Sequence, residues 1–260
     1  MDLIEYVTRH ASLALVGLAI FAAMIVSREI GAKLFSMLRP VLLPPEPVRI
    51  NESHIVAAVL GILLVLIGFG FYLAVDRHEV RRDLVVSEAS ALKTAYLRSE
   101  FLDDPTALQS SLRAYTQARL AYGLSQESDR KAKASEASKL QNPVWHEVIV
   151  ATKSLRSEPL PSLISVPINE AFGIADRRNA IADARIPTPV LTTIALYLFA
   201  MTGILGFTTS SAGGQHRVGS FLLFALLTSV IILTLDIDRP RGGLRVPQIA
   251  MSDALAAMKL

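Results

Sequence analysis

The sequence contains no cysteine and only one tryptophan among its 260 residues, and aromatic residues make up 7% of it. Without cysteine, disulfides, thiolate metal sites and cysteine nucleophiles are all excluded. The low aromatic content argues against a transmembrane β-barrel, which carries aromatic girdles at both membrane interfaces. The sequence also has no Walker loop, no GxGxxG after a predicted strand and no HExxH motif, so nothing marks a nucleotide or zinc-protease site.

Charge is scarce as well. The net charge is +3, charged residues make up 19% of the sequence, and hydrophobic residues make up 52%. The basic residues lie beside apolar runs rather than among aromatics, which is typical of membrane orientation and not of nucleic-acid binding. We therefore expect an all-α integral membrane protein in contact with the lipid bilayer, with no cofactor and no nucleic-acid partner.

Four apolar runs are long enough to suggest membrane helices. The longest has 22 residues without a formal charge, which at about 1.5 Å per residue crosses a hydrocarbon core of roughly 30 Å. Apart from His54 at one edge, the runs contain no aspartate, glutamate, lysine, arginine or histidine, which argues against a proton relay or an ion-coupled pump. The predicted spans are 11–27, 54–75, 189–207 and 220–235.

The second span is the element around which the rest is organised. No proline or glycine occurs between Phe71 and Asp104, so nothing stops a helix that leaves the membrane and continues into the charged sequence up to Phe101. In the charged part, the apolar spacing i, i+4, i+7, i+11 predicts one buried face that needs a partner. The residues of this face are Val85, Ala89, Leu92 and Tyr96.

Residues 76–187 are predicted to form an antiparallel helical module. A helix should follow Asp104-Pro105, which resemble an N-cap and a first helical residue, and a further helix should follow Asn142-Pro143. Between them, 125–139 has no apolar stripe and is expected to be a solvated hairpin or a frayed helix.

The last helix of the module should return to the membrane over about 162–186, kinked or started at Pro167. Its heptad-spaced seam is expected to pack antiparallel against the long helix, with Asn179 as a lone polar residue in an apolar interface. The seam consists of Ile168, Phe172, Ala175, Asn179, Ala182 and Ile186.

Segment 28–53 is predicted to be a connector between the first two spans. Its first half has the pattern of an amphipathic helix on the membrane surface, while its second half carries four prolines and is not expected to be helical. Asn51 is expected to cap the second span. The predicted division is then 1–53, 54–75, 76–187, 188–235 and a cytoplasmic tail, 236–260.

Lysine and arginine near the span ends predict the orientation. The side that holds both termini and the module has ten of them, against five on the opposite side. We therefore expect a multi-pass protein of a bacterial inner (plasma) membrane, with the module and both termini in the cytoplasm. The ten are Arg9, Arg77, Arg81, Arg82, Arg177, Arg178, Arg185, Arg239, Arg241 and Arg245; the five are Arg28, Lys33, Arg39, Arg49 and Arg217.

The fourth span runs into LDIDRPRGGLRV, residues 235–246. This ending resembles the signature of a bestrophin-like membrane family that has no established activity. The charged continuation of the second span, the return helix ending in Arg185-Ile186-Pro187, and the order of two spans, helical module and two spans are similar to that family too. The resemblance covers about 51–246. The name of this family points to the bestrophins, which are oligomeric anion channels. The resemblance therefore implies a homo-oligomer that conducts ions.

Asp236, Asp238 and Arg239 lie where the fourth span meets the cytoplasm. In a structural interpretation Arg239 pairs with one aspartate and anchors the helix end. Carboxylates at a helix C-terminus oppose the helix dipole, so they need arginines of the module or a cation. The alternative is an acidic ring at a pore mouth, which would favour cations and conflicts with an anion channel.

Several other residues are candidate neighbours of this charge cluster. His78 and Glu79 could add nitrogen and oxygen ligands for an inorganic ion, although the histidines are scattered and no metal site is the favoured interpretation. Arg82 and Arg178 are candidate partners for the aspartates. Glu88 is expected to be a buried partner of an arginine on the return helix.

Phe69 and Phe71 could form an apolar constriction if a pore exists, although their neighbours Gly68 and Gly70 fit a close helix crossing better. The sequence leaves two functions open. One is an oligomeric ion channel, and the other is a non-transporting scaffold or signalling module whose helical part binds a cytoplasmic protein of unknown identity. No nucleophile, base and orienting group are visible together, so an enzyme is not expected.

Overall fold

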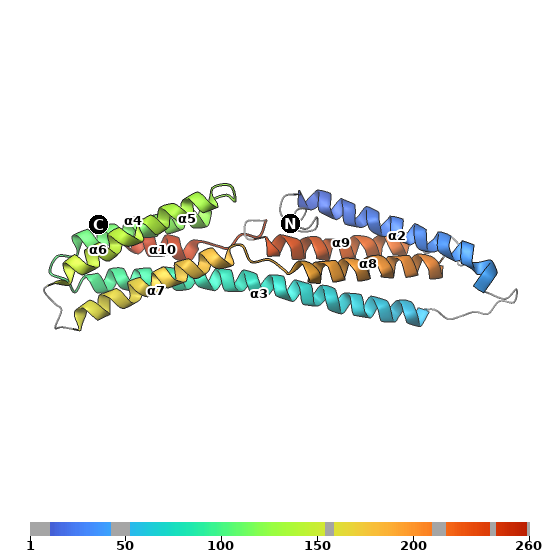
Figure 1. The fold of residues 1–260 in the computed structure, drawn as a ribbon, viewed down its shortest axis with the longest axis horizontal. Coiled ribbons are helices and arrows are strands. Elements are labelled where there is room, and N and C mark those ends of the chain that lie inside the picture. The colour runs from blue at the N-terminus through green and yellow to red at the C-terminus, as the bar shows by residue number, and fades with distance from the viewer. Residues whose placement is uncertain (1–10, 43–52, 154–158, 210–216, 240–242, 259–260) are drawn as a thin grey trace. The chain divides into compact units, whose positions relative to one another are not determined.

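The computed structural model describes residues 11–42, 53–153, 159–209, 217–239 and 243–258, and these ranges contain helices and no β-strand (Figure 1). In chain order the helices are α2 (Leu13–Leu42), α3 (Ser53–Ser99), α4 (Thr106–Leu124), α5 (Arg130–Lys139), α6 (Gln141–Ala151), α7 (Leu160–Ile181), α8 (Thr188–Thr209), α9 (Arg217–Asp238) and α10 (Ile249–Ala257).

The chain forms two compact units. The apolar unit comprises Met1–Asp76 and Arg185–Gly243, and the helical module comprises Arg77–Ala184 and Leu244–Leu260. Helix α3 contributes its first part to the apolar unit and its second part to the module. The predicted unbroken helix from the second span into the charged sequence is confirmed, because α3 runs for 47 residues without interruption.

Four helices are long and apolar enough to cross a membrane: Leu13–Leu38, Val56–Ser99, Thr188–Thr209 and Arg217–Asp238. In the core of the apolar unit, each of its four helices supplies a buried side chain to one cluster, namely Met24, Leu63, Leu198 and Phe224. Large aliphatic side chains such as Leu18 and Val65 lie exposed on the outside. This distribution is consistent with a multi-pass membrane protein, because lipid tails can cover exposed leucine and valine.

Exposed hydroxyl groups of the last two apolar helices bond carbonyls of their own helix. The Thr192 and Thr193 hydroxyls donate to the carbonyls of residues 188 and 189 at 2.9 and 2.8 Å, and the Ser229 hydroxyl donates to the Ala225 carbonyl at 2.8 Å. A hydroxyl that bonds the i−4 carbonyl leaves no donor facing hydrocarbon. Exposed threonine and serine are therefore compatible with helices in lipid.

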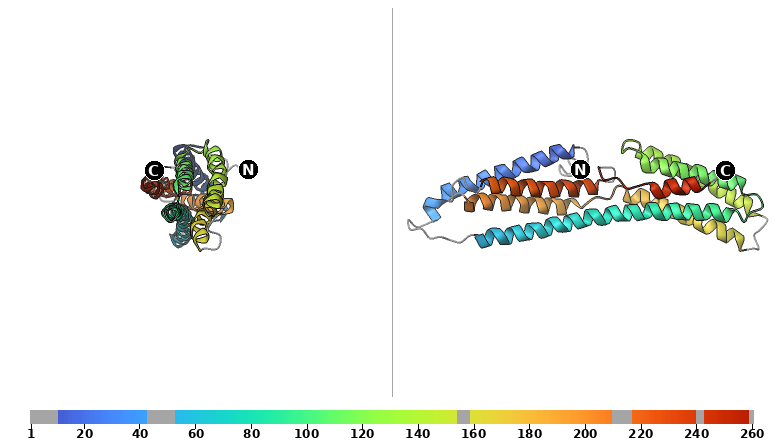
Figure 2. Two further views of the ribbon diagram at one scale, coloured as in Figure 1. Left: turned by 90° about the vertical axis from the view of Figure 1, so that its left-hand side faces the viewer. Right: turned by 180° about the vertical axis from the view of Figure 1, so that it is seen from behind.

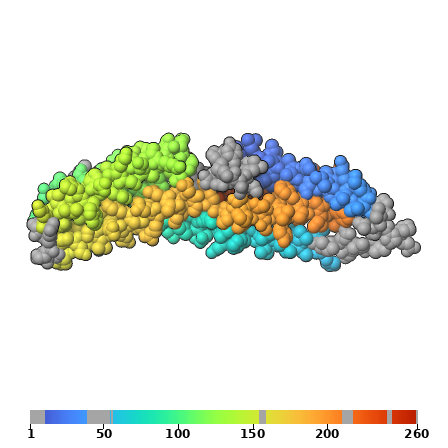
Figure 3. Space-filling view, in the orientation of Figure 1, coloured from blue at the N-terminus to red at the C-terminus, as the bar shows by residue number. Residues whose placement is uncertain are grey.

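Helices α2 and α8 lie side by side (Figure 3), and small residues bring their backbones to very close range. The Ser27 hydroxyl donates to the Phe199 carbonyl at 2.7 Å. A Cβ added to Gly31 would lie 1.9 Å from the carbonyl oxygen of Gly203, and one added to Gly206 would lie 1.9 Å from that of Arg28. Only glycine lets the two backbones approach this closely, as in other membrane helix pairs.

The predicted connector is partly wrong, because α2 continues without interruption through its first half. Residues 28–42 extend the first span rather than forming a separate surface helix. Pro40 lies in the last turn of α2, where losing one backbone hydrogen bond shortens a helix without preventing it. The remaining connector prediction and the Asn51 cap lie outside the described residues.

The module packs around α3 as the apolar spacing predicts. Val85, Ala89, Leu92 and Tyr96 are all buried, in one core cluster with residues of α4 and α7 such as Leu112 and Ile168. Helix α7 is antiparallel to α3, because Arg98 near the end of α3 bonds Leu163 at the start of α7, while Glu88 further back pairs with Arg178 near the end of α7. Figure 2 shows the two helices from behind.

Three details of the module differ from the sequence prediction. Helix α4 begins at Thr106, one residue late, although the Asp104 carboxylate still accepts the Thr106 N–H at 3.1 Å. Helix α6 begins at Gln141, so Asn142 is not its cap; Pro143 fits in the first turn because N–H groups there have no helical partner. Helix α7 begins at Leu160, close to the expected start and with Pro167 inside it, but it ends at Ile181 rather than near residue 186.

The C-terminal region is more than a tail. Helix α10 belongs to the module, where Met251, Ala254 and Met258 are buried in the same core as α3 and α4. The prediction of a cytoplasmic tail over 236–260 missed this helix. Nine residues without a strong apolar period, directly after a proline- and glycine-rich stretch, give too weak a pattern to predict one.

Candidate functional site

Asp238, the last residue of α9, holds the start of α8. Its carboxylate is buried, with the residue 5% exposed, and its two oxygens accept the Ile186 backbone N–H at 3.1 and 3.2 Å. The Asp238 carbonyl accepts a hydrogen bond from the Arg185 guanidinium at 2.9 Å. One residue thus fixes the turn that enters α8 against the end of α9.

Asp236 holds the chain that follows α9. Its Oδ1 accepts the Gly243 backbone N–H at 2.7 Å, which closes the chain after the proline back onto α9. A Cβ added to Gly243 would lie 2.8 Å from Asp236 Oδ2, so a larger residue would push the carboxylate away. Gly243 therefore leaves room for the Asp236 carboxylate in the position where it accepts this bond.

Arg239 reaches the beginning of the first span. Its Nη2 donates to the Ala11 carbonyl at 3.0 Å, directly before α2. Burial lowers the pKa of Arg239, and the negative charge of Asp236 opposes that shift. No ion pair between Arg239 and either aspartate occurs among the residues that the structure describes, so the predicted pairing gives way to bonds with backbone groups.

These contacts bring three helix ends and the middle of α3 together in the apolar unit. The end of α9 meets the starts of α8 and α2 through Asp238 and Arg239, and Ala74 of α3 packs with Ile186 and Ile237 in a small apolar cluster. The DIDRP motif therefore joins the helices that the sequence predicts to end on one side of the membrane. Carboxylates that accept backbone N–H bonds are well suited to fixing chain geometry.

The other residues predicted near this motif lie in the module. On α3, Glu79 and Arg82 are exposed and His78 is half-buried. Across the described ranges, no group of three or more histidine, cysteine, aspartate or glutamate side chains is placed to hold a metal ion. Phe69 is 52% exposed on the outside of α3, whereas Phe71 packs against the apolar cluster around Ala74.

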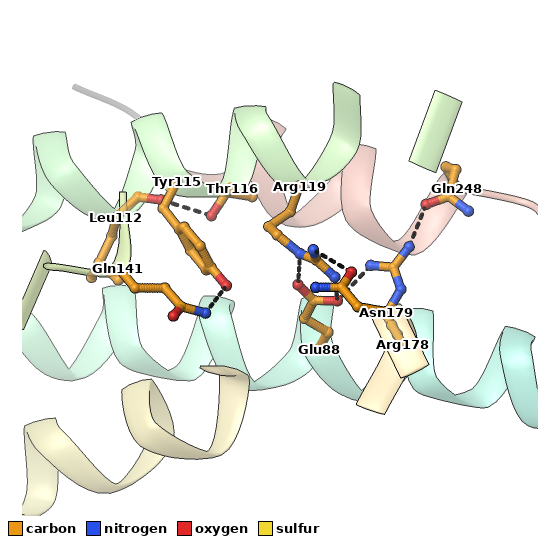
Figure 4. Close-up of polar contacts among 9 residues, drawn as sticks. All are labelled: Glu88, Leu112, Tyr115, Thr116, Arg119, Gln141, Arg178, Asn179 and Gln248. Atoms are coloured by element: carbon orange, nitrogen blue, oxygen red, sulfur yellow. Dashed lines mark hydrogen bonds and ion pairs between the residues drawn. The ribbon is translucent and has the colours of Figure 1, made fainter. Parts of the chain in front are cut away.

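A second cluster lies inside the module and is centred on Glu88, which is completely buried (Figure 4). Its two carboxylate oxygens receive guanidinium groups from two helices, Arg119 of α4 and Arg178 of α7. The Arg119 Nη2 donates to Glu88 Oε2 at 3.1 Å, and its Nη1 donates to Asn179 Oδ1 at 3.3 Å. Arg178 Nη2 donates to Gln248 Oε1 at 3.2 Å. We call these five residues the charge cluster.

The charge cluster holds two positive groups against one carboxylate. Neutral oxygens of Asn179 and Gln248 and the ring of Tyr122 compensate for the difference, because the guanidinium carbons of Arg119 and Arg178 lie 4.7 and 5.7 Å from the ring centroid. Burial pulls the pKa of Arg119 down, but the hydrogen bond and charge of Glu88 outweigh it and raise that pKa. Glu88 is therefore the shared counter-ion of the two arginines.

Tyr115 closes the apolar side of this cluster. Burial raises the pKa of Tyr115 to about 12, and its hydroxyl receives a hydrogen bond of 3.4 Å from Gln141. Its ring packs edge-on against Phe172, with centroids 5.2 Å apart.

The sequence predicted part of this cluster. The expected buried pair between Glu88 and an arginine of the return helix is confirmed by Arg178. Asn179 is not a lone polar residue, because Arg119 contacts it. Arg119 itself was missed, although it lies on the buried stripe of α4 with Leu112, Tyr115 and Tyr122, where a charged residue signals a buried partner.

The chain matches no protein-family model, and neither curated proteins nor solved structures show a significant similarity to it.

Proposed function

We propose that this chain is a subunit of a homo-oligomeric membrane scaffold, in which the helical module faces the cytoplasm and binds a protein partner. The main support for an oligomer comes from the outer face of α3. Gly61 and Gly68 lie on it, and a Cβ added to either would meet no heavy atom within 4 Å. Glycine weakens a helix, so glycines facing outward are best explained by a second helix that approaches closely.

The orientation rests on the excess of arginine near the span ends on the side of the module. The bonds at the end of α9 support a common side for three helix ends, since they hold the start of α2, the start of α8 and the end of α9 together. A chain that crosses the membrane four times has both termini on the same side.

A scaffold is favoured because the charged groups at both candidate sites hold structure. Asp236 and Asp238 accept backbone N–H bonds, and Glu88 binds two arginines of its own module. The module also exposes large apolar side chains, among them Phe101 at 65%, which suit contact with another protein. The resemblance to the bestrophin-like family remains part of this proposal, as a family in which a helical module is carried by four spans.

An ion channel is the second candidate, and Phe69 favours it. If the outer face of α3 lined the axis of an oligomer, Phe69, which lies exposed beside Gly68, would form an apolar constriction there. Phe71 packs inside the apolar unit and is poorly placed for this role.

The oligomer is tested by the mass of the particle in detergent. We expect a multiple of the 28.2 kDa chain, and Gly61→Leu should reduce the multiple because a leucine side chain keeps the neighbouring α3 away. Ala200→Leu, at an exposed position of α8, is the matched control. A wild-type particle with the mass of one chain would contradict the oligomer.

Scaffold and channel are separated by ion flux through reconstituted vesicles. For the scaffold, Asp238→Asn lowers stability by about 1–3 kcal/mol because a buried N–H loses a charged acceptor, and wild type shows no flux at any potential. For a channel with an acidic mouth, wild type conducts, Asp236→Asn shifts selectivity towards anions, and high salt reduces that shift by screening over about 8–10 Å.

A further inference from the structure

The module has a free end, opposite the end where α3 enters it and α7 leaves it. At the entry end, Arg81 of α3 donates to the Ala184 carbonyl after α7 at 2.8 Å. At the free end, Arg98 of α3 donates to the Leu163 carbonyl at the start of α7 at 3.0 Å. The two contacts are about 25 Å apart along α3, at roughly 1.5 Å of rise per residue.

Helix α6 lies at the free end and exposes apolar side chains there (Figure 1). On its inner side, Val144 and Val148 belong to the module core. On its outer side, Trp145, Ile149 and Val150 are exposed. Because the apolar helices join the module at its other end, protein is favoured over lipid as the cover of this apolar face.

Positive charges flank the apolar face of α6. Lys139 precedes the helix and Lys153 follows it, and both are exposed, as is His146 between them. The acidic residue of α6, Glu147, is half-buried. Such a surface fits an apolar side chain that has carboxylates beside it. We call the following residues the α6 face: Lys139, Trp145, Ile149, Val150 and Lys153.

The loop that joins α3 to α4 has the complementary pattern. Phe101 is 65% exposed, and Glu100 and Asp103 beside it are exposed as well. Leu102 is buried in the module core and anchors the loop there. The loop directly follows α3, so it also lies at the free end. We call residues 100–104 the acidic loop.

The acidic loop and the α6 face fit one another, and both are exposed in the structure. An aromatic ring between two carboxylates matches an apolar face between two ammonium groups. Both surfaces lie at the same end of the module. Copies of the chain that stand side by side in one membrane with the same orientation therefore present them at a similar height.

We propose that the acidic loop of one chain binds the α6 face of a second copy, so that neighbouring modules are joined at their free ends. This rests on the homo-oligomer proposed above and adds a contact outside the membrane to that of α3. In a dimer the contact forms twice, and in a ring it forms once for each subunit. Phe101 is the apolar anchor, and the charges beside it select the partner surface.

A photo-crosslinker at Phe101 tests this contact in the full-length chain in the membrane. p-Benzoylphenylalanine in place of Phe101 keeps an aromatic ring and bonds covalently to what the ring touches. We expect a covalent dimer of the chain, with the linked peptide, identified by mass spectrometry, within residues 139–153. The same group in place of Leu124, which is exposed at the other end of α4, is the matched control and should give no link to that peptide.

Charge reversal tests the specificity of the contact. Lys139→Glu with Lys153→Glu should lower the yield of the crosslinked dimer about three- to tenfold, because each exposed ion pair contributes little but both attractions become repulsions. Adding Glu100→Lys and Asp103→Lys to the same chain should restore the yield.

The control for this reversal is Lys93→Glu with Lys131→Glu. Both lysines are exposed, on α3 and α5, so the net charge changes equally without a change in the α6 face. The yield of the dimer should stay that of wild type.

Fluorescence supplies a measurement that needs no crosslink, since Trp145 is the only tryptophan of the sequence. If Phe101 of the neighbouring chain covers Trp145, Phe101→Ser shifts the Trp145 emission to longer wavelength. Leu124→Ser should leave the emission unchanged.

A linked peptide outside residues 139–153, or a link within one chain, in a particle of oligomeric mass would overturn this contact and leave the homo-oligomer intact. The same holds for links to another protein or to lipid, and for a yield that does not respond to the charge reversals. Absence of any link together with unchanged Trp145 emission in Phe101→Ser would overturn it as well. A wild-type particle of single-chain mass would instead overturn the proposed function.

Discussion

Glu88 is the residue on which the interior of the module depends most directly. It is the shared counter-ion of Arg119 and Arg178, and all three side chains are buried. Removing a partner from a buried charge network costs more than the network itself contributes, because the remaining charges stay desolvated. The charge cluster is therefore sensitive to single neutral substitutions.

We expect Glu88→Gln to destabilise the protein by about 3–5 kcal/mol, since two guanidinium groups keep only neutral oxygens around them. Thermal unfolding in detergent, followed by circular dichroism, measures the change. Glu79→Gln, at an exposed position of the same helix, should change stability by less than about 0.5 kcal/mol. Equal melting temperatures for both variants would show that the cluster is not structural.

Tyr115 predicts a dependence of stability on alkaline pH. Its pKa in the folded protein is about 12, above the value of about 10 for an unfolded chain. The stabilisation is complete below pH 10 and is lost as the pH rises to 12, by at most roughly 3 kcal/mol, because only the unfolded chain releases the proton early. Denaturant titrations should show a smaller fall for Tyr115→Phe, whereas the exposed control Tyr72→Phe should keep the fall of wild type.

Residue pairs could be predicted from the sequence only where a charged residue interrupts an apolar helix face. Glu88 interrupts an apolar face of α3, so a buried arginine partner could be expected, and Arg178 supplies it. Arg119 and Gln248 also belong to the charge cluster, but they come from segments far from Glu88 and Arg178 in the sequence. Spacing within one helix contains no information about such a third partner, so it requires the fold.

Among the elements, the contact between α2 and α8 has the least tolerance for added volume. Gly206 and Gly31 lie against backbone atoms, which cannot rotate away as a flexible side chain can. Gly206→Ala should therefore separate the two helices and cost about 1–3 kcal/mol. Gly219→Ala, in open space on α9, should be neutral or slightly stabilising because alanine favours helix. Thermal unfolding of the two variants compares them directly, and equal stability would contradict the close contact.

The ends of elements were the least predictable part of the fold. Helix α2 runs into the proline-bearing stretch and α6 begins before Asn142-Pro143, because a proline is tolerated in the first turn of a helix and shortens rather than forbids the last. The four apolar helices were predictable, since long uncharged runs have few alternatives to a helix in lipid.

At the scale of the whole molecule, the module is built from two separate segments of the chain, and this constrains the path of the chain across a membrane. The module contains Arg77–Ala184 before α8 and Leu244–Leu260 after α9, so both segments must lie on the same side of any membrane that α8 and α9 cross. A reporter inserted at 125–129 and one fused after Leu260 should therefore agree, and the arginine excess predicts cytoplasmic activity for both. Opposite activities would contradict the module, and periplasmic activity of both would contradict the orientation.

The place of α10 in the module core also determines when the protein can finish folding during its synthesis. The ribosome releases residues 77–184 first, then α8 and α9, and only afterwards Met251, Ala254 and Met258, which fill the core. During the insertion of the last two spans, the module core still lacks α10, and chaperones or proteases can recognise the apolar side chains that α10 later covers. A messenger RNA truncated within this interval would yield a chain with all its spans but without α10 in the module core, which quality control can distinguish from the finished protein.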